Sequence, residues 1–216
     1  MSSDPLAAFD ALPLKERLFV RGRLFTAPLL EVARRAPSGR IVDVGCGHGL
    51  MVSLLASGRP ERTVVGLDPD PKKIDWAKAS VGTLPNVSLE VGTVEALAAR
   101  AAGTFDAVVV CDVLYLLPKP AWRGFLEACR ALLEPGGALL LKEAEADRSW
   151  RYYKCLAQER LMVQLLRRTK SSGGLGFVPR AEMELELSHA GFKLDEVVGL
   201  GRGYTTPHVL FAARRS

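Results

Sequence analysis

The sequence lacks an apolar run of the ~18 residues that a membrane-spanning helix needs, and its N-terminus lacks the basic-then-apolar order of a secretory signal. Its 4 cysteines show no C-x-x-C spacing, and its 3 histidines are scattered, so we expect no metal site. Cysteines this far apart are typical of free thiols in a reducing compartment. These absences predict a cytoplasmic protein that holds neither zinc nor disulfides.

The 216 residues are 48% hydrophobic, which is enough for one domain with a substantial core, and the net charge of +5 permits an acidic partner without requiring one. We expect residues 1–36 to be an N-terminal helical segment, because apolar residues recur at helical spacing from Pro13 to Arg35 with a break near Pro28. The basic residues of this segment indicate either a solvated helix face or a binding surface. Beyond it, apolar runs predict strands at 41–44, 63–68, 87–91, 105–110, 138–141, 192–198 and 206–213.

The first of these runs ends in three alternating glycines, Gly45, Gly47 and Gly49, and Asp43 precedes them. Glycine permits positive φ and removes the Cβ that would hold a ligand away from the backbone. A dinucleotide fingerprint has the spacing G-x-G-x-x-G, which places pyrophosphate on a helix N-terminus. The spacing here is G-x-G-x-G, which differs from that fingerprint. A strand, a glycine turn and a helix in this order suit a nucleoside ligand across the strand ends, although glycine-rich turns are often only tight turns.

A second acidic residue, Asp68, ends the next strand about 20 residues beyond the glycines, where nucleoside-binding α/β proteins place a carboxylate for the ribose hydroxyls. A carboxylate makes charge-assisted hydrogen bonds to such hydroxyls. The alternative role for Asp68 is an N-cap, because Pro69-Asp70-Pro71 begins the next helix.

Three ordered motifs, D-x-G-x-G-x-G at 43–49, L-x-P-G-G-x-L-x-L at 133–141 and A-G-F at 190–192, resemble those of the class I S-adenosylmethionine (SAM) dependent methyltransferases. The resemblance covers residues 30–214. It implies one doubly wound, Rossmann-like α/β domain over 1–216. Its seven-stranded sheet is mostly parallel with an antiparallel last strand, and a helical lid is inserted at 149–176, after strand five.

The same resemblance implies SAM as the cofactor. Asp43 would brace the glycine loop and the amino-acid end of SAM, and Asp68 would bind the ribose. The family often has Gly-Asp-Ala after strand three, and Thr93 stands here in place of the Asp, so a hydroxyl or the neighbouring Val94 would contact adenine. The full set of implied cofactor residues is Asp43, Gly45, Cys46, Gly47, Gly49, Asp68, Pro69, Thr93, Val94, Cys111 and Asp112.

No general base stands out. Tyr115 occupies the first His position of the family's V-L-H-H-L segment, and Glu143 and His208 are further candidates if the acceptor is a hydroxyl. A structural role for His208 competes with a catalytic one. The segment after strand four lacks the N-P-P-Y type motif of enzymes that methylate amino groups of DNA bases. Its absence argues against adenine or cytosine in duplex DNA as the substrate.

The segment 149–170 is basic and carries aromatic residues, which suits a lid over a small-molecule or lipid-like acceptor and peripheral contact with a membrane. The alternative is that 149–170 is an ordinary surface helix, which packs on the domain and contacts neither acceptor nor membrane. Two other functions remain open: an RNA or protein methyltransferase that docks through its basic helices, and a SAM-binding protein without turnover.

Overall fold

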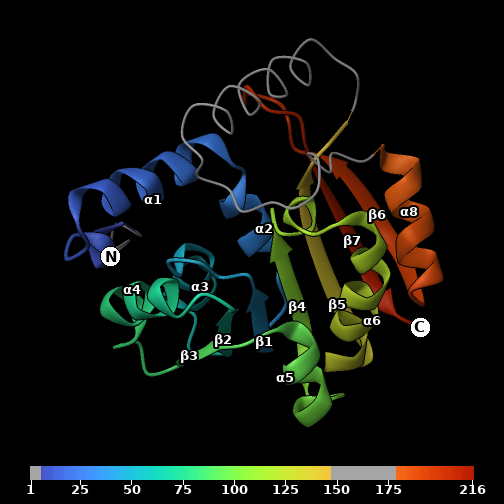
Figure 1. The fold of residues 1–216 in the computed structure, drawn as a ribbon, viewed down its shortest axis with the longest axis horizontal. Helices are drawn as coiled ribbons and strands as arrows, with labels where there is room; N and C mark the ends of the chain where they lie inside the picture. Colours follow the sequence, from blue (N-terminus) through green and yellow to red (C-terminus); the bar gives the residue numbers. More distant parts are fainter. Residues whose placement is uncertain (1–5, 147–178) are drawn as a thin grey trace.

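The computed structural model describes residues 6–146 and 179–216 (Figure 1). Within these ranges one seven-stranded sheet has the order β3-β2-β1-β4-β5-β7-β6. The predicted lid at 149–176 and the predicted membrane contact at 149–170 lie outside the described residues. The strands are β1 (Gly39–Val44), β2 (Arg62–Asp68), β3 (Val87–Val91), β4 (Phe105–Cys111), β5 (Leu133–Ala144), β6 (Phe192–Gly199) and β7 (His208–Arg215).

Strands β1 to β5 pair in parallel, and the last strand, β7, is antiparallel, as the sequence predicts. β7 pairs with both β5 and β6. In the register of β1 and β4, Val44 lies opposite Val110, so the carboxyl ends of the two strands meet at one edge. An open α/β sheet binds its ligands at this edge. β5 is longer than the predicted 138–141, because pairing with β4 begins at Leu133 and continues past an irregularity.

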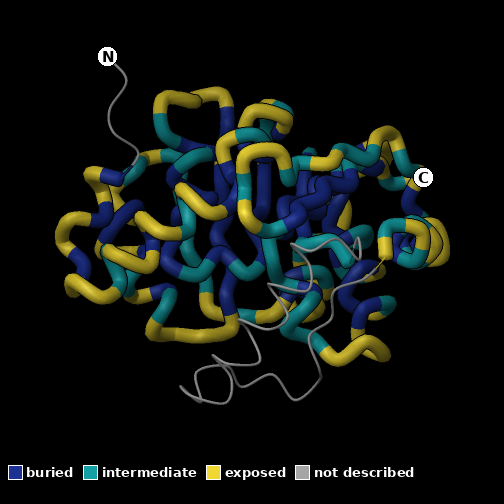
Figure 2. The backbone as a smooth tube through the Cα atoms, turned by 90° about the horizontal axis from the view of Figure 1, so that it is seen from above, coloured by how far each residue is buried: buried dark blue, intermediate teal, exposed yellow. Residues whose placement is uncertain are grey.

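Helices cover both faces of the sheet, because alternate side chains of a buried strand point to opposite faces. Val42 and Val44 pack in the core that contains α5, α6 and α8, while Ile41 packs in the core that contains α1 to α4. Figure 2 shows the buried central strands between helices that expose their outer surfaces. The helices are α1 (Leu14–Thr26), α2 (Leu29–Arg35), α3 (Leu50–Ala56), α4 (Pro71–Val81), α5 (Val94–Ala101), α6 (Trp122–Leu132) and α8 (Arg180–His189).

The break predicted near Pro28 separates α1 from α2. Ala27, which precedes the proline, is extended with φ −131° and ψ 141°, because the proline ring disfavours helical geometry at the preceding residue. The sequence analysis missed α5, whose eight residues begin directly after Thr93. Among the described helices none is long and apolar enough to cross a membrane.

Candidate active site

A cleft of about 440 Å³ opens at the carboxyl edge of the sheet, within the size range of small-molecule sites. Helix α1 lies beyond the ends of β1 and β4 and forms one wall (Figure 1). The glycine loop after β1, the end of β2 and the segment after β4 form the others. Its lining residues from these three segments include Asp43, Gly45, Cys46, Gly47, Asp68, Pro69, Cys111, Asp112 and Tyr115.

The glycine loop needs its glycines for two different reasons. Gly47 has φ +55°, and a Cβ there would meet nothing within 4 Å, so its backbone is open to a ligand. A Cβ on Gly45, at φ +77°, would come within 2.5 Å of Val113 Cγ2, so the loop packs closely against the segment after β4. Gly49 does not line the cleft. It has φ +84°, and its added Cβ would meet Val81 Cγ2 at 3.0 Å and Ala77 Cβ at 3.2 Å, so backbone conformation and close packing on α4 both favour glycine there.

Asp68 ties the loop to the end of β2. Its Oδ2 accepts a hydrogen bond from the backbone N–H of Gly47 at 3.0 Å, and its Oδ1 accepts one from the N–H of Asp70 at 2.9 Å. The N-cap of α4 is Asp70, whose side chain accepts from the N–H of Lys72. The N-cap alternative for Asp68 is therefore wrong, and its carboxylate lines the cleft.

Asp43 presents an unsatisfied acceptor to the cleft. It is 2% exposed, and its Oδ2 has no hydrogen-bond partner among the described residues. Burial, together with the negative charge of Asp68, raises the pKa of Asp43 to about 8. A buried acceptor without a donor is costly, so this atom fits a ligand that brings an N–H or O–H group.

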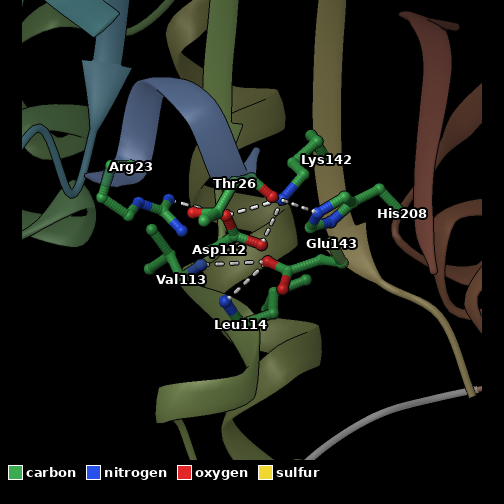
Figure 3. Close-up of polar contacts among 8 residues, drawn as sticks. All are labelled: Arg23, Thr26, Asp112, Val113, Leu114, Lys142, Glu143 and His208. Atoms are coloured by element: carbon green, nitrogen blue, oxygen red, sulfur yellow. Dashed lines mark hydrogen bonds and ion pairs between the residues drawn. The ribbon is translucent and has the colours of Figure 1, made fainter. Parts of the chain in front are cut away.

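At the end of β4 the carboxylate of Asp112 holds two cations. Lys142 Nζ lies 2.7 Å from each carboxylate oxygen, and Arg23 Nη2 from α1 lies 2.7 Å from Oδ2 (Figure 3). Burial alone would raise the pKa of Asp112, but the charges of Lys142 and Arg23 outweigh it and hold the pKa well below its usual range. Asp112 has φ +58°, a conformation uncommon outside glycine, and it turns the chain sharply toward the cleft.

The three candidate bases occupy different environments. Tyr115 lines the cleft, whereas Glu143 and His208 are buried beside the Asp112 cluster and are not among the cleft-lining residues. Glu143 Oε1 accepts from the backbone N–H groups of Val113 at 3.0 Å and Leu114 at 2.9 Å (Figure 3). Burial and the charge of Asp112 raise the pKa of Glu143 to about 8. Glu143 thereby fixes the backbone of the segment that carries Tyr115.

His208 joins β7 to α1. Its Nε2 lies 3.0 Å from the backbone oxygen of Thr26, so Nε2 carries the proton in this contact. Burial and the positive charge of Lys142 lower the pKa of His208 to about 4, which keeps the ring neutral at pH 7. The contact with Thr26 gives His208 a structural role, which was the alternative to a catalytic role in the sequence analysis.

Sequence reasoning left open whether the basic residues of α1 form a solvated helix face or a binding surface. Arg23 belongs to the second kind, because it lines the cleft and pairs with Asp112. His48, in the variable position of the glycine motif, also lines the cleft. Its Nε2 contacts Glu16 Oε2 at 3.0 Å, and its ring stacks on Trp76 at 4.8 Å between centroids. Phe19 and Arg23 lie four residues apart, which places them on the same side of a helix. This spacing could have indicated that both line the cleft.

Thr93 and Val94 do not line the cleft. Thr93 Oγ1 accepts from the N–H of Ala96 at 3.3 Å and caps α5, and Val94 is 2% exposed. The hydroxyl that was assigned to adenine is therefore engaged by the helix. Adenine contact by these two residues stays a prediction.

Comparison with known proteins gives the same class as the geometry. Residues 41–137 match the family model of a methyltransferase domain. The ubiquinone biosynthesis O-methyltransferase of Xanthomonas axonopodis pv. citri (strain 306) is 32% identical over 169 residues, which cover 78% of this chain and 69% of that protein. The protein of the same name from Xanthomonas campestris pv. campestris (strain B100) is 37% identical over 105 residues, 49% of this chain and 43% of that protein. The chain thus spans only part of these relatives.

Solved structures share the fold at low identity. An O-methyltransferase family protein from Burkholderia thailandensis has a TM-score of 0.73 at 19% identity, covering 94% of this chain and 59% of that one. A SAM dependent methyltransferase from Aquifex aeolicus has a TM-score of 0.69 at 18% identity over 100% of both chains. The sheet order and the cleft define a class I methyltransferase fold. The chain belongs to the SAM-dependent methyltransferase family.

SAM is the cofactor of this family, and the described residues fit it. The unpartnered Oδ2 of Asp43 suits the donor groups of its amino-acid end, the bare backbone at Gly47 permits close approach, and the carboxylate of Asp68 suits ribose hydroxyls.

Proposed function

We propose that the chain transfers the methyl group of SAM to an oxygen atom of a small, largely apolar acceptor that enters the cleft between α1 and the segment after β4. The observation that carries the proposal is the composition of this part of the cleft. Apolar residues of α1, the start of α2 and the segment after β4 line the cleft together with Tyr115: Phe19, Val20, Leu29, Val113, Leu116 and Leu117. A duplex nucleic acid would need a broad basic surface instead.

The relatives' names support the choice of oxygen as the methylated atom. They are O-methyltransferases of ubiquinone biosynthesis. A hydroxylated aromatic ring with an apolar substituent fits walls of this kind, because the apolar side chains bury the substituent and the ring.

SAM supplies an electrophilic methyl group on a sulfonium that departs as a neutral thioether, so the chain mainly has to align the acceptor and exclude water. In our proposal Asp68 and the glycine loop bind and orient the cofactor. Val113, fixed through Glu143, packs under Gly45 and sets the loop position. Of the three candidate bases, Tyr115 is the one that lines the cleft, and its hydroxyl would accept the proton of the acceptor while its own phenolic proton passes to water.

The test is a turnover assay that measures S-adenosylhomocysteine formed from SAM with three acceptor sets: alkyl-substituted catechols, structured RNA and a protein extract. We expect turnover with the catechols and no steep dependence on salt. Turnover with RNA alone, falling strongly between low and high salt, would favour the RNA-docking alternative. Tight SAM binding without product in any set would favour the non-catalytic alternative.

A further inference from the structure

Lys73, in the first turn of α4, is a cation at a place where it does not help the helix. α4 begins at Pro71, directly after its cap, Asp70. Lys72 and Lys73 follow, and the first turn holds no acidic residue. The N-terminal end of a helix carries partial positive charge, so lysines there are locally unfavourable. A residue that breaks a local rule without an evident gain in stability is a candidate for function.

The two lysines of this turn point in different directions, because successive side chains on a helix are about 100° apart. Lys72 Nζ lies over the ring of Trp76, 5.1 Å from its centroid, and Lys72 is not among the residues that line the cleft. Lys73 lines the cleft, and its side chain is 40% exposed. Of the two lysines, Lys73 is therefore the one placed to contact a ligand.

Lys73 faces Asp68, the carboxylate that ends β2. Its Nζ lies 3.9 Å from Oδ2 of Asp68, whose own side chain is only 4% exposed. The charge of Lys73 also reaches the glycine loop. Burial and the charges of two carboxylates raise the pKa of the Cys46 thiol, and the charge of Lys73 opposes them. The ammonium group is therefore near both the end of β2 and the loop that Asp68 holds.

The distance between Lys73 and Asp68 suits one oxygen atom that bonds both. At 3.9 Å the two charged atoms are too far apart for a direct hydrogen bond. An oxygen about 2.8 Å from each of them would have its two partners at an angle of roughly 90°, close to the angle between the O–H and a lone pair of a hydroxyl. A hydroxyl can donate to the carboxylate and accept from the ammonium at the same time.

The carboxylate of Asp68 keeps acceptor sites for such a donor. An ionised carboxylate has about four lone-pair sites. The N–H of Gly47 uses one on Oδ2, and the N–H of Asp70 uses one on Oδ1. No other donor in the part of the chain that the structure describes bonds this carboxylate, so each oxygen keeps one site for a ligand in the cleft.

We propose that Lys73 is a cofactor-binding residue, which donates to one ribose hydroxyl of SAM while that hydroxyl donates to Asp68. The inference rests on the cofactor part of the proposed function and does not depend on the identity of the acceptor. It makes the cleft selective for ribonucleosides, because a nucleoside without that hydroxyl cannot join the ammonium to the carboxylate. It also accounts for a lysine at the unfavourable end of α4.

The test compares S-adenosylhomocysteine with its 2′-deoxy and 3′-deoxy forms by calorimetric titration of the native chain and of Lys73→Met. Methionine keeps an unbranched side chain without the ammonium. Lys73→Met should weaken binding of the parent ligand roughly 5- to 30-fold. The same substitution should leave the affinity for one of the two deoxy forms within twofold of the native value, because that form lacks the hydroxyl that Lys73 contacts.

Lys72→Met is the matched control, since it removes the neighbouring lysine of the same helical turn, which does not line the cleft. It should change the affinity for none of the three ligands. Lys73→Arg keeps a cationic donor at the position and should lose less affinity for the parent ligand than Lys73→Met. The melting temperature of each variant is measured alongside to show that it folds.

Equal losses for all three ligands in Lys73→Met would overturn the proposal, because they would mean that Lys73 acts only on the charge or position of Asp68. An unchanged affinity of Lys73→Met for the parent ligand would also overturn it. A native chain that does not bind S-adenosylhomocysteine would overturn this proposal together with the cofactor assignment. Failure of every acceptor in the turnover assay, by contrast, would leave the result for Lys73 standing.

Discussion

The backbone N–H of Gly47 donates to Oδ2 of Asp68 at 3.0 Å, so the carboxylate that ends β2 holds the glycine loop that follows β1. Two features that sequence reasoning treated as separate cofactor contacts are therefore one unit. Moving either would move the other, because the loop and the acid share this bond.

Asp68→Ala should weaken S-adenosylhomocysteine binding by one to three kcal/mol, roughly 5- to 150-fold, because it removes a charged acceptor from the cleft and releases the loop. Asp70→Ala is the matched control, since Asp70 caps α4. It should lower stability by about 1 kcal/mol and leave affinity unchanged. Calorimetric titration and urea unfolding of both variants check this. Equal affinities for the two variants would contradict it.

Asp43→Asn should change how stability depends on pH. The pKa of Asp43 is raised to about 8 in the folded chain, above its ordinary value, so the native chain loses stability as pH rises toward 8. Asparagine does not titrate, so stability should shift in favour of the variant between pH 5 and pH 8, by at most about 1.4 kcal/mol per pH unit.

Urea unfolding of the ligand-free native chain and of Asp43→Asn at the two pH values measures the shift. The same variant should bind S-adenosylhomocysteine more weakly, because the donor groups of the ligand favour the ionised form of Asp43 and asparagine cannot ionise. Parallel stability curves for the two chains would show that Asp43 is not protonated in the folded state.

Tyr115→Phe should lower kcat at least tenfold and leave S-adenosylhomocysteine affinity unchanged, because the phenol lies on the cleft wall and acts on the acceptor. Glu143→Gln should keep kcat within a few-fold, since an amide oxygen can still accept from Val113 and Leu114. Steady-state kinetics with the best catechol acceptor compares them. The reverse order of effects would make Glu143 the base.

Glu16→Ala should loosen α1 over the cleft. Only Val20 of its 13 residues is buried, so the helix depends on polar contacts such as Glu16 with His48 and Arg23 with Asp112. Hydrogen exchange of the α1 amides should speed up while the β4 amides keep their protection. Lys15→Ala, an exposed neighbour, is the control. Unchanged exchange in both variants would mean that the Glu16 contact does not hold the helix.

The centre of the sheet could be predicted from the sequence because β1, β2 and β4 are buried apolar runs. Phe105–Cys111 and Arg62–Asp68 end where apolar residues give way to polar or glycine residues, and the A-G-F turn at 190–192 marks the start of β6. α5 was missed because it is short and its cap, Thr93, was assigned to adenine.

The cofactor side of the site was predictable for a similar reason. Asp43, the glycine loop and Asp68 end neighbouring parallel strands, and such ends meet at one edge. The pairing of Arg23 with Asp112 was not predictable, because the two residues lie 89 positions apart in the sequence. A helical pattern shows which residues share a face but not what that face covers. The burial that separates Tyr115 from Glu143 and His208 has no sequence signal.

The central claim is that the cleft binds SAM through the glycine loop and Asp68. The most direct measurement is thermal unfolding of the native chain with S-adenosylhomocysteine or with NAD, each at increasing concentration. At about 100 times its dissociation constant, S-adenosylhomocysteine should stabilise the chain by about 2.7 kcal/mol, and NAD should leave the melting temperature unchanged. A shift with NAD and none with S-adenosylhomocysteine would contradict the account.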